Sequence, residues 1–304
     1  MVGRRALVGF LTVAVLVSLM PISCASGGGP VNLTHNPRAN DTRPCWSSDG
    51  GRIIFVSSSA LAPPYAEPTV NDCGIYVMDS NGANRSLLLP ICPRSISWSP
   101  DSNRVAFSID GGGLFTIDLE ATGSVNVVPD PYIYIDSLSY SPDGSRILFA
   151  AGGEEPWHIY VVDTDGSEKT CLSPPDAEDG CPAWSPDGTK IAFESKREGN
   201  WEIYLMDADG GNPRRLTDNS ASDVFPTWSP DGKRLAFVSK RAGEPEIYIM
   251  DADGGNVTRL TDNDISEVGP KWSPGGAKIV FYGNRGDSGG ADDIYVVDVP
   301  GDQR

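Results

Sequence analysis

The sequence predicts an all-β fold, a six-bladed β-propeller of four-stranded antiparallel blades whose last blade is closed by an N-terminal strand. Three observations predict it. A motif recurs about every 44 residues, apolar and polar residues alternate with a period of two inside each repeat, and a motif missing from the last repeat is found at the start of the chain. The 304 residues include 34 glycines and 25 prolines, which suits short strands joined by tight turns.

The repeat is marked by an aromatic residue followed by serine. The dipeptide occurs at Trp46, Trp98, Tyr140, Trp184, Trp228 and Trp272, with spacings of 52, 42, 44, 44 and 44 residues. A second marker follows each one, as in "IYLMD" from Ile203 and "IYIMD" from Ile247. Self-similarity at this period indicates propeller blades or a solenoid.

Each repeat contains four predicted strands. In "RLAFVS", Leu235 and Phe237 alternate with Arg234 and Ala236, and β-branched or aromatic residues dominate. We expect an inner strand ending at the tryptophan, then "RLAFVS", "IYIMD" and an outer "TRLT". Six such units with no helical pattern favour the propeller.

The two ends of the chain are predicted to meet in one blade. The last unit ends at "IYVVDVPGDQR" without an outer strand, whereas "VNLTHN" at Val31–Asn36 matches the "RLTDN" of earlier units. The N-terminal segment should therefore complete blade 6 and remove an exposed strand edge. A solenoid would not need this displaced strand.

The "WSPDG" stretch is predicted to be a turn and not a reaction centre. Proline presets φ, aspartate tolerates the next position, and glycine accepts the left-handed conformation of a hairpin. The residue types of the motif also vary between repeats, which a reaction centre would not tolerate. Ser48 replaces the proline in one repeat, Ser102 the glycine in another, and Gly275 the aspartate in a third.

Taken together, "P-x-W-S-P-D-G-x-x-I-A-F" and "I-Y-x-M-D-A-D-G-G-N-x-x-R-L-T-D" resemble the repeat of TolB-type propellers. The resemblance covers residues 31–299 and is strongest in the fourth and fifth units. It implies an extracytoplasmic propeller that serves as a protein-interaction or ligand-binding platform. TolB itself carries an additional N-terminal α/β domain that has no counterpart here, so a role in the Tol-Pal system is not carried over.

The first 30 residues are predicted to direct export. Arg4 and Arg5 precede an apolar run from Ala6 to Met20, which is short for a transmembrane helix and suits a signal peptide over residues 1–23. Ser23-Cys24 resembles a bacterial lipobox, which makes Cys24 the predicted lipidation site, although cleavage after Ala25 is the alternative. Residues 24–30 would form a flexible tether, and residues 31–304 the propeller.

The remaining cysteines suggest two disulfides in an exported protein. Cys171 and Cys181 flank one loop, and Cys73 and Cys92 both lie near predicted strand ends, so these two pairs are the candidates. Reduced, small apolar side chains are the alternative. Cys45, inside a predicted strand, is expected to be a buried free thiol.

Charge and motif content exclude several functions. A net charge of −17 argues against nucleic acid as a partner, and two histidines make a histidine metal site improbable. "GDSGG" at 286–290 matches a protease nucleophile motif but lacks a histidine partner, so it is interpreted as a loop. "DADGGN", at Asp207 and Asp251, is interpreted as a turn, with weak calcium binding as the alternative, and no other cofactor is expected.

Four acids lie five residues before the aromatic residue of their repeat, and three arginines lie thirteen residues after it. The acids are Asp41, Asp179, Asp223 and Glu267, with Asp136 displaced by one step, and the arginines are Arg197, Arg241 and Arg285. They form either ion pairs within blades or a ring at the channel mouth that would bind a cation or basic ligand.

Strand order places the repetitive turns on one face and the irregular loops 57–74, 152–158 and 283–293 on the other, where Tyr65 and Trp157 could anchor a partner. We expect a monomeric, lipid-anchored, non-enzymatic scaffold in the cell envelope or periplasm that binds an envelope protein or peptide. The alternatives are a carbohydrate-active or hydrolytic propeller enzyme, and a sensor that binds a small ligand at the channel mouth.

Overall fold

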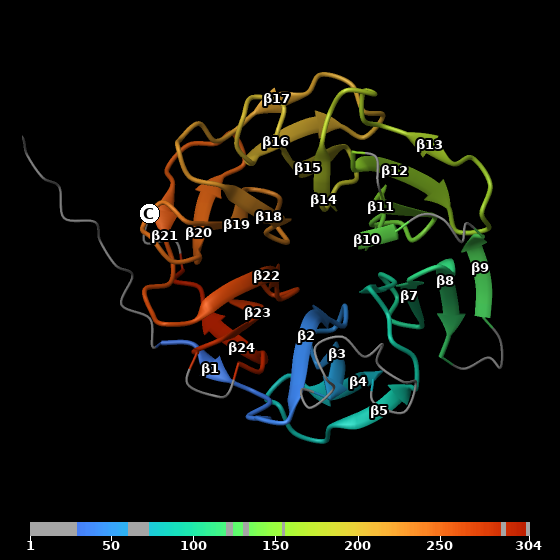
Figure 1. The fold of residues 1–304 in the computed structure, drawn as a ribbon, viewed down its shortest axis with the longest axis vertical. Helices are drawn as coiled ribbons and strands as arrows, with labels where there is room; N and C mark the ends of the chain where they lie inside the picture. The colour runs from blue at the N-terminus through green and yellow to red at the C-terminus, as the bar shows by residue number, and fades with distance from the viewer. Residues whose placement is uncertain are drawn as a thin grey trace, which may run out of the picture.

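The computed structural model describes residues 29–59, 73–119, 124–129, 134–153, 156–286 and 290–301. Within them, 24 strands form six four-stranded antiparallel sheets, and no helix is present. The sheets are arranged as blades around a central channel (Figure 1). The predicted six-bladed propeller is confirmed. The predicted signal segment and Cys24 lie outside the described residues.

The strands of blades 1–5 run from the channel outward in chain order, and blade 6 takes its outermost strand from the N-terminus. Blade 1 holds β2 (Ala39–Trp46), β3 (Arg52–Ser59), β4 (Cys73–Asp79) and β5 (Ser86–Leu89); blade 2 holds β6 (Ser95–Trp98), β7 (Arg104–Ile109), β8 (Gly113–Asp118) and β9 (Ser124–Val128). Blade 3 holds β10 (Tyr134–Tyr140), β11 (Arg146–Gly152), β12 (His158–Asp163) and β13 (Thr170–Cys171); blade 4 holds β14 (Asp179–Trp184), β15 (Lys190–Ser195), β16 (Glu202–Asp207) and β17 (Arg214–Arg215). Blade 5 holds β18 (Asp223–Trp228), β19 (Arg234–Ser239), β20 (Glu246–Asp251) and β21 (Thr258–Arg259); blade 6 holds β22 (Ser266–Trp272), β23 (Lys278–Asn284), β24 (Asp293–Asp298) and β1 (Val31–Asn32).

The N-terminal strand closes the ring as predicted. In β1, Val31 pairs with Val296 and Asn32 with Tyr295. Just beyond β1, the Thr34 hydroxyl donates to Asp293 at 2.8 Å and accepts the Ile294 amide at 3.0 Å. The "RLTDN" units of blades 4 and 5 place a threonine hydroxyl in the same position on Ile203 and Ile247. The displaced motif therefore reproduces the contacts of its homologous repeats.

The serine and aspartate of "WSPDG" lock the turn between the first two strands of a blade. In blade 5 the Ser229 hydroxyl donates to Asp231 at 2.6 Å and accepts the Arg234 amide at 2.9 Å, while Gly232 has φ +70°. Gly232 also lies against Pro186 of the preceding blade, so the proline of one turn packs on the glycine of the next. The motif joins strands within a blade and blades to one another.

Each blade has an aromatic pair across its second and third strands. Phe237 and Tyr248 stack in blade 5 with ring centroids 6.0 Å apart, and the other five blades have a pair at the equivalent position. Such pairs add to the apolar area buried between neighbouring blades. The core is therefore distributed around the ring, which leaves the channel wall to the innermost strands.

Candidate functional site

The acids predicted at the channel mouth are buried inside the blades. Asp41, Asp179, Asp223 and Glu267 are at most 1% exposed. Three of them accept an arginine of their own blade: Arg85 contacts Asp41 at 3.0 Å, and Arg197 and Arg241 contact Asp179 and Asp223 at 2.7 Å. The structure therefore shows these three acids in ion pairs within their blades, which is the first of the two alternatives given by the sequence.

The guanidinium groups of Arg197 and Arg241 each contact an aromatic ring and a serine hydroxyl in addition to the carboxylate. The Arg241 guanidinium lies 4.8 Å from the Tyr248 ring centroid and also donates to the Ser239 hydroxyl at 2.9 Å. Arg197 has the corresponding contacts with Tyr204 and Ser195. Stacking on an aromatic face and pairing with a carboxylate are compatible uses of the planar guanidinium. These arginines are structural members of their blades.

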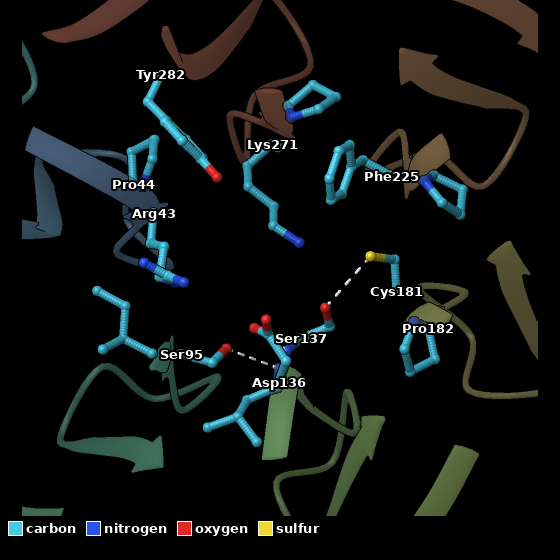
Figure 2. A pocket seen from close by; sticks show the side chains of 15 residues that line it. Arg43, Pro44, Ser95, Asp136, Ser137, Cys181, Pro182, Phe225, Lys271 and Tyr282 are labelled. Atoms are coloured by element: carbon cyan, nitrogen blue, oxygen red, sulfur yellow. Dashed lines mark hydrogen bonds between the residues drawn. The ribbon is translucent and has the colours of Figure 1, made fainter. Parts of the chain in front are cut away.

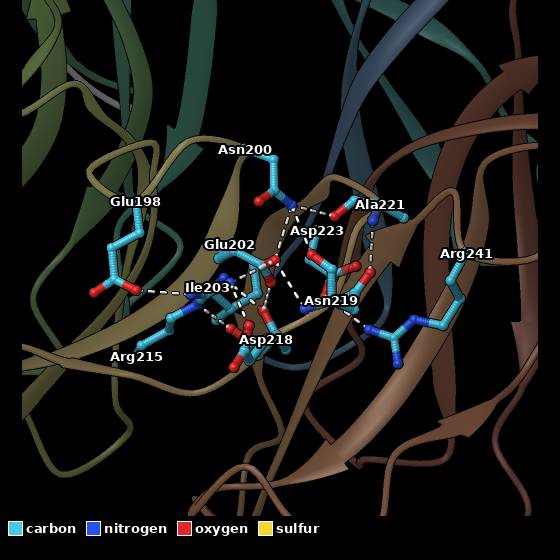
Figure 3. Close-up of polar contacts among 11 residues, drawn as sticks. Glu198, Asn200, Glu202, Ile203, Arg215, Asp218, Asn219, Ala221, Asp223 and Arg241 are labelled. Carbon is cyan, nitrogen blue, oxygen red and sulfur yellow. Dashed lines mark hydrogen bonds and ion pairs between the residues drawn. The ribbon is translucent and has the colours of Figure 1, made fainter.

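A second buried carboxylate extends this network between blades 4 and 5 (Figure 3). Glu202 accepts Arg215 at 2.9 Å and the Thr217 hydroxyl at 2.6 Å. Asn219 donates its backbone amide to Glu202 and its side-chain amide to Asp223. The outer strand of blade 4 is thereby connected to the inner strand of blade 5. We call Asp41, Asp179, Asp223, Glu267 and their partners the blade latches.

The latch of blade 6 lacks the arginine. Glu267 accepts the Thr261 hydroxyl at 2.6 Å, the Asn263 side chain at 2.7 Å and the Ile247 amide at 2.8 Å. Arg285 instead lies 3.7 Å from Asp264 and 5.7 Å from the Tyr295 ring centroid. Burial is the largest cause that raises the pKa of Glu267, to about 7, and the nearby Glu246 adds to it.

The residues that reach the channel lie two positions after the latch acids. Arg43, Cys181, Phe225 and Gly269 have φ between 44° and 59°, and so does Ser137 in blade 3. Each coincides with a register shift between the first two strands of its blade. These are β-bulges, which re-aim a side chain and are common beside binding sites. Positive φ is strained for a bulky residue such as Phe225.

The bulges surround a cavity of about 130 Å³ in the channel (Figure 2). Arg43 and Lys271 reach into it from blades 1 and 6, and Asp136 from blade 3. Among the described residues, neither Arg43 nor Lys271 has a hydrogen-bond or ion-pair partner for its charged group. Most of the lining residues lie in the middle of the innermost strands, between the face with the irregular loops and the face with the turns.

Cys181 links this cavity to a neighbouring one of about 290 Å³ lined by Trp157, Trp201 and Glu194. The Ser137 hydroxyl donates to the Cys181 sulfur at 3.3 Å, and burial raises the pKa of that thiol well above its usual value. Glu194 accepts the Phe225 amide at 2.9 Å. Burial raises the pKa of Glu194 to about 7.

The predicted pair Cys171–Cys181 is not formed. Cys171 is exposed on the outermost strand of blade 3, whereas Cys181 is on the innermost strand of blade 4. Their closeness in sequence spans the connection between two blades, which separates them across the sheet. Cys73 and Cys92 are also free thiols here, yet close enough that Cys92, after burial, helps raise the pKa of Cys73 to about 12. Cys45 is free and half-buried.

The "DADGGN" stretches form turns. Asp207 accepts Lys190 and Asn212, and Asp209 accepts the Gly211 amide. In the described part of the chain, no group of three or more His, Cys, Asp or Glu residues is placed to hold a metal ion. The central residues of "GDSGG" and Tyr65 lie outside the described residues.

Comparison with known proteins identifies the family. The family model of the TolB beta propeller domain matches residues 65–223 and 176–303. The chain belongs to the TolB beta-propeller family. No curated protein sequence matches it. Over the described residues, no helix is long and apolar enough to cross a membrane.

Solved structures share this TolB-type fold at low sequence identity. A protein from Agrobacterium tumefaciens described as a TolB is 23% identical, with a TM-score of 0.65 over 86% of this chain and 91% of its own. TolB from Acinetobacter baumannii is 22% identical, with a TM-score of 0.65 over 85% of this chain and 63% of its own. An oligogalacturonate lyase from Vibrio parahaemolyticus is 15% identical, with a TM-score of 0.61 over 90% of this chain and 94% of its own. At these identities the likeness establishes the fold alone.

The sequence predicted the strands but did not single out the residues that line the channel cavity. The acids were selected because they recur in most repeats, whereas the bulge residues differ among the five blades that have one. A usable signal was present, because Arg43, Cys181, Phe225 and Gly269 stand two positions after the recurring acids. Variation at one position of a repeated unit marked the channel wall.

Proposed function

We propose that this protein is an exported, non-enzymatic binding scaffold of the bacterial cell envelope, anchored through lipid on Cys24. The single observation that supports it most is the channel wall. Five of the six blades have a bulge at the channel, each with a different residue there, and the charged groups of Arg43 and Lys271 have no partner among the described residues. Variable side chains on a rigid repeated scaffold are typical of recognition sites.

The binding face would be the one that carries the irregular loops. The parts of loops 152–158 and 283–293 that the structure describes lie on this face, and Trp157 of the first loop lines the cavity that adjoins the channel cavity. A partner protein or peptide of the envelope would contact the loops and place an end or side chain near Arg43 and Lys271. The family membership and the predicted export signal agree with an envelope location.

Affinity capture from native envelope tests this proposal. The mature chain should retain a specific partner, and the double variant Arg43→Glu/Lys271→Glu should lose it. The control is Lys233→Glu, which reverses an exposed charge in a "WSPDG" turn on the opposite face. If the double variant and the control retain the same proteins equally, the channel is not the recognition site. Mass spectrometry of the mature N-terminus tests lipidation at Cys24.

A second function, a sensor for a small ligand, is favoured by one observation. The channel cavity is compact and lined by charged groups and apolar side chains, which is the pattern of a small-molecule site. Binding of a ligand there would change the charge that a partner meets at the channel. The two functions are therefore compatible within one molecule.

A further inference from the structure

Two cationic side chains, Arg43 and Lys271, line the same channel cavity. The chain has 41 acidic and 24 basic residues, and the blade arginines Arg85, Arg197 and Arg241 all have carboxylate partners. Arg43 and Lys271 have none among the described residues, although both line the same cavity. An anionic ligand group between them would complete the pairing, and a carboxylate suits the guanidinium fork.

A carboxylate faces these cations across the cavity. Asp136 accepts the Ser137 amide through Oδ1 at 2.7 Å, and its Oδ2 lies 3.8 Å from Arg94. That second contact is longer than a hydrogen bond, which leaves Oδ2 able to accept another donor. Figure 2 shows the Asp136 carboxylate and the Lys271 ammonium directed at the same central space. The cavity therefore has a cationic side and an anionic side.

Most of the rest of the wall is apolar, and Ser95, Ser137 and Tyr282 add hydroxyl groups to it. Leu138, Phe225 and Ile96 contribute apolar side chains, and the prolines that follow four of the bulge residues add to them. A cavity of about 130 Å³ holds about four waters at roughly 30 Å³ each, and an apolar protein cavity of roughly 150 Å³ binds benzene. The matching ligand is therefore small and carries both charges.

We propose that the channel cavity binds a free α-amino acid with a small to medium apolar side chain. Arg43 and Lys271 bind the carboxylate, Asp136 binds the ammonium, and Phe225 and Leu138 contact the side chain. Dicarboxylates and diamines are disfavoured. The second carboxylate of a dicarboxylate would be repelled by Asp136, and one amine of a diamine would be repelled by Arg43 and Lys271. This inference rests on the sensor function proposed above and names its ligand class.

Isothermal titration calorimetry of the mature chain with leucine is the test. Leucine should bind, and Arg43→Gln/Lys271→Met should weaken its binding at least about tenfold, since both charged donors to the carboxylate are lost. Asp136→Asn should weaken leucine while leaving 4-methylpentanoate, the same acid without its amine, unchanged or tighter. The matched control, Lys233→Met on the opposite face, should bind leucine as the wild type does.

Three outcomes would overturn the proposal. The first is that none of glycine, alanine, valine, leucine and phenylalanine binds. Equal affinity for leucine and 4-methylpentanoate would show an acid site that ignores Asp136. Equal affinity for leucine and leucinamide would show a site for an amine or a peptide N-terminus. Envelope capture without added amino acid tests the scaffold function separately. Each proposal therefore has its own experiment, and failure of one does not count against the other.

Discussion

The blade latches and the channel bulges lie two residues apart in the same strands and differ in almost every property. Asp223 is fully buried, has an arginine and an amide partner, and its counterparts in most other repeats are acids. Phe225 is half-buried at positive φ, and its counterparts are Arg43, Cys181 and a glycine. A repeated, ion-paired position maintains the fold, whereas a variable, strained position is free to serve a ligand.

The largest expected effect comes from breaking a latch. Asp223→Ala should lower the free energy of unfolding by about 3–5 kcal/mol, because it leaves the Arg241 charge and the Asn219 amide without their buried partner. Urea unfolding followed by tryptophan fluorescence measures it. The control is Asp231→Ala in the exposed turn. A loss for Asp223→Ala no larger than for this control would remove the distinction between latch and turn.

The latch without an arginine should make stability depend on pH. Burial raises the pKa of Glu267 to about 7 in the folded state, from a usual value of 4.5. A raised carboxyl pKa means that its contribution is complete below pH 4.5 and is lost as the pH rises through 7. The difference corresponds to roughly 3 kcal/mol.

Comparing unfolding of the wild type and Glu267→Gln between pH 4.5 and pH 8 isolates this contribution. The glutamine variant should lose less stability over that range than the wild type. Glu198→Gln, at an exposed position paired with Arg215, should follow the wild-type profile. Parallel profiles for the wild type and Glu267→Gln would show that Glu267 stays charged throughout.

The sequence was sufficient to predict the blades, and it was not sufficient to separate latch from channel. Trp228, the alternation from Arg234 to Ser239, and Val31–Asn36 each encode local geometry, so strands and ring closure followed from them. Whether Asp223 points into the blade or into the channel depends on a bulge that shifts the register by one residue. Single-residue register changes redirect side chains, and no propensity in "DVFPTW" reveals one.

The cysteines make the same point. Cys171 and Cys181 are ten residues apart, but an outer strand and an inner strand of different blades hold them. Sequence distance is a poor guide to spatial distance wherever the chain passes from one blade to the next. Pairing predictions are safer within a hairpin, where the strands themselves bring residues together.

The smallest expected effect on stability is that of Phe225→Gly, which tests the other half of the comparison. Glycine removes a half-buried ring but also relieves the left-handed strain at φ 58°, which costs roughly 1–2 kcal/mol for a residue with a Cβ. The two contributions should nearly cancel, so that unfolding changes by no more than about 1 kcal/mol. The control Phe237→Ala, at a fully buried stacked position, should lose about 3–5 kcal/mol of unfolding free energy.

Leucine affinity should fall several-fold in Phe225→Gly, because the ring forms part of the apolar wall. A stability loss as large as that of Phe237→Ala would mean that the bulge residue is a core residue after all, and that strand position alone does not distinguish fold from function in this ring.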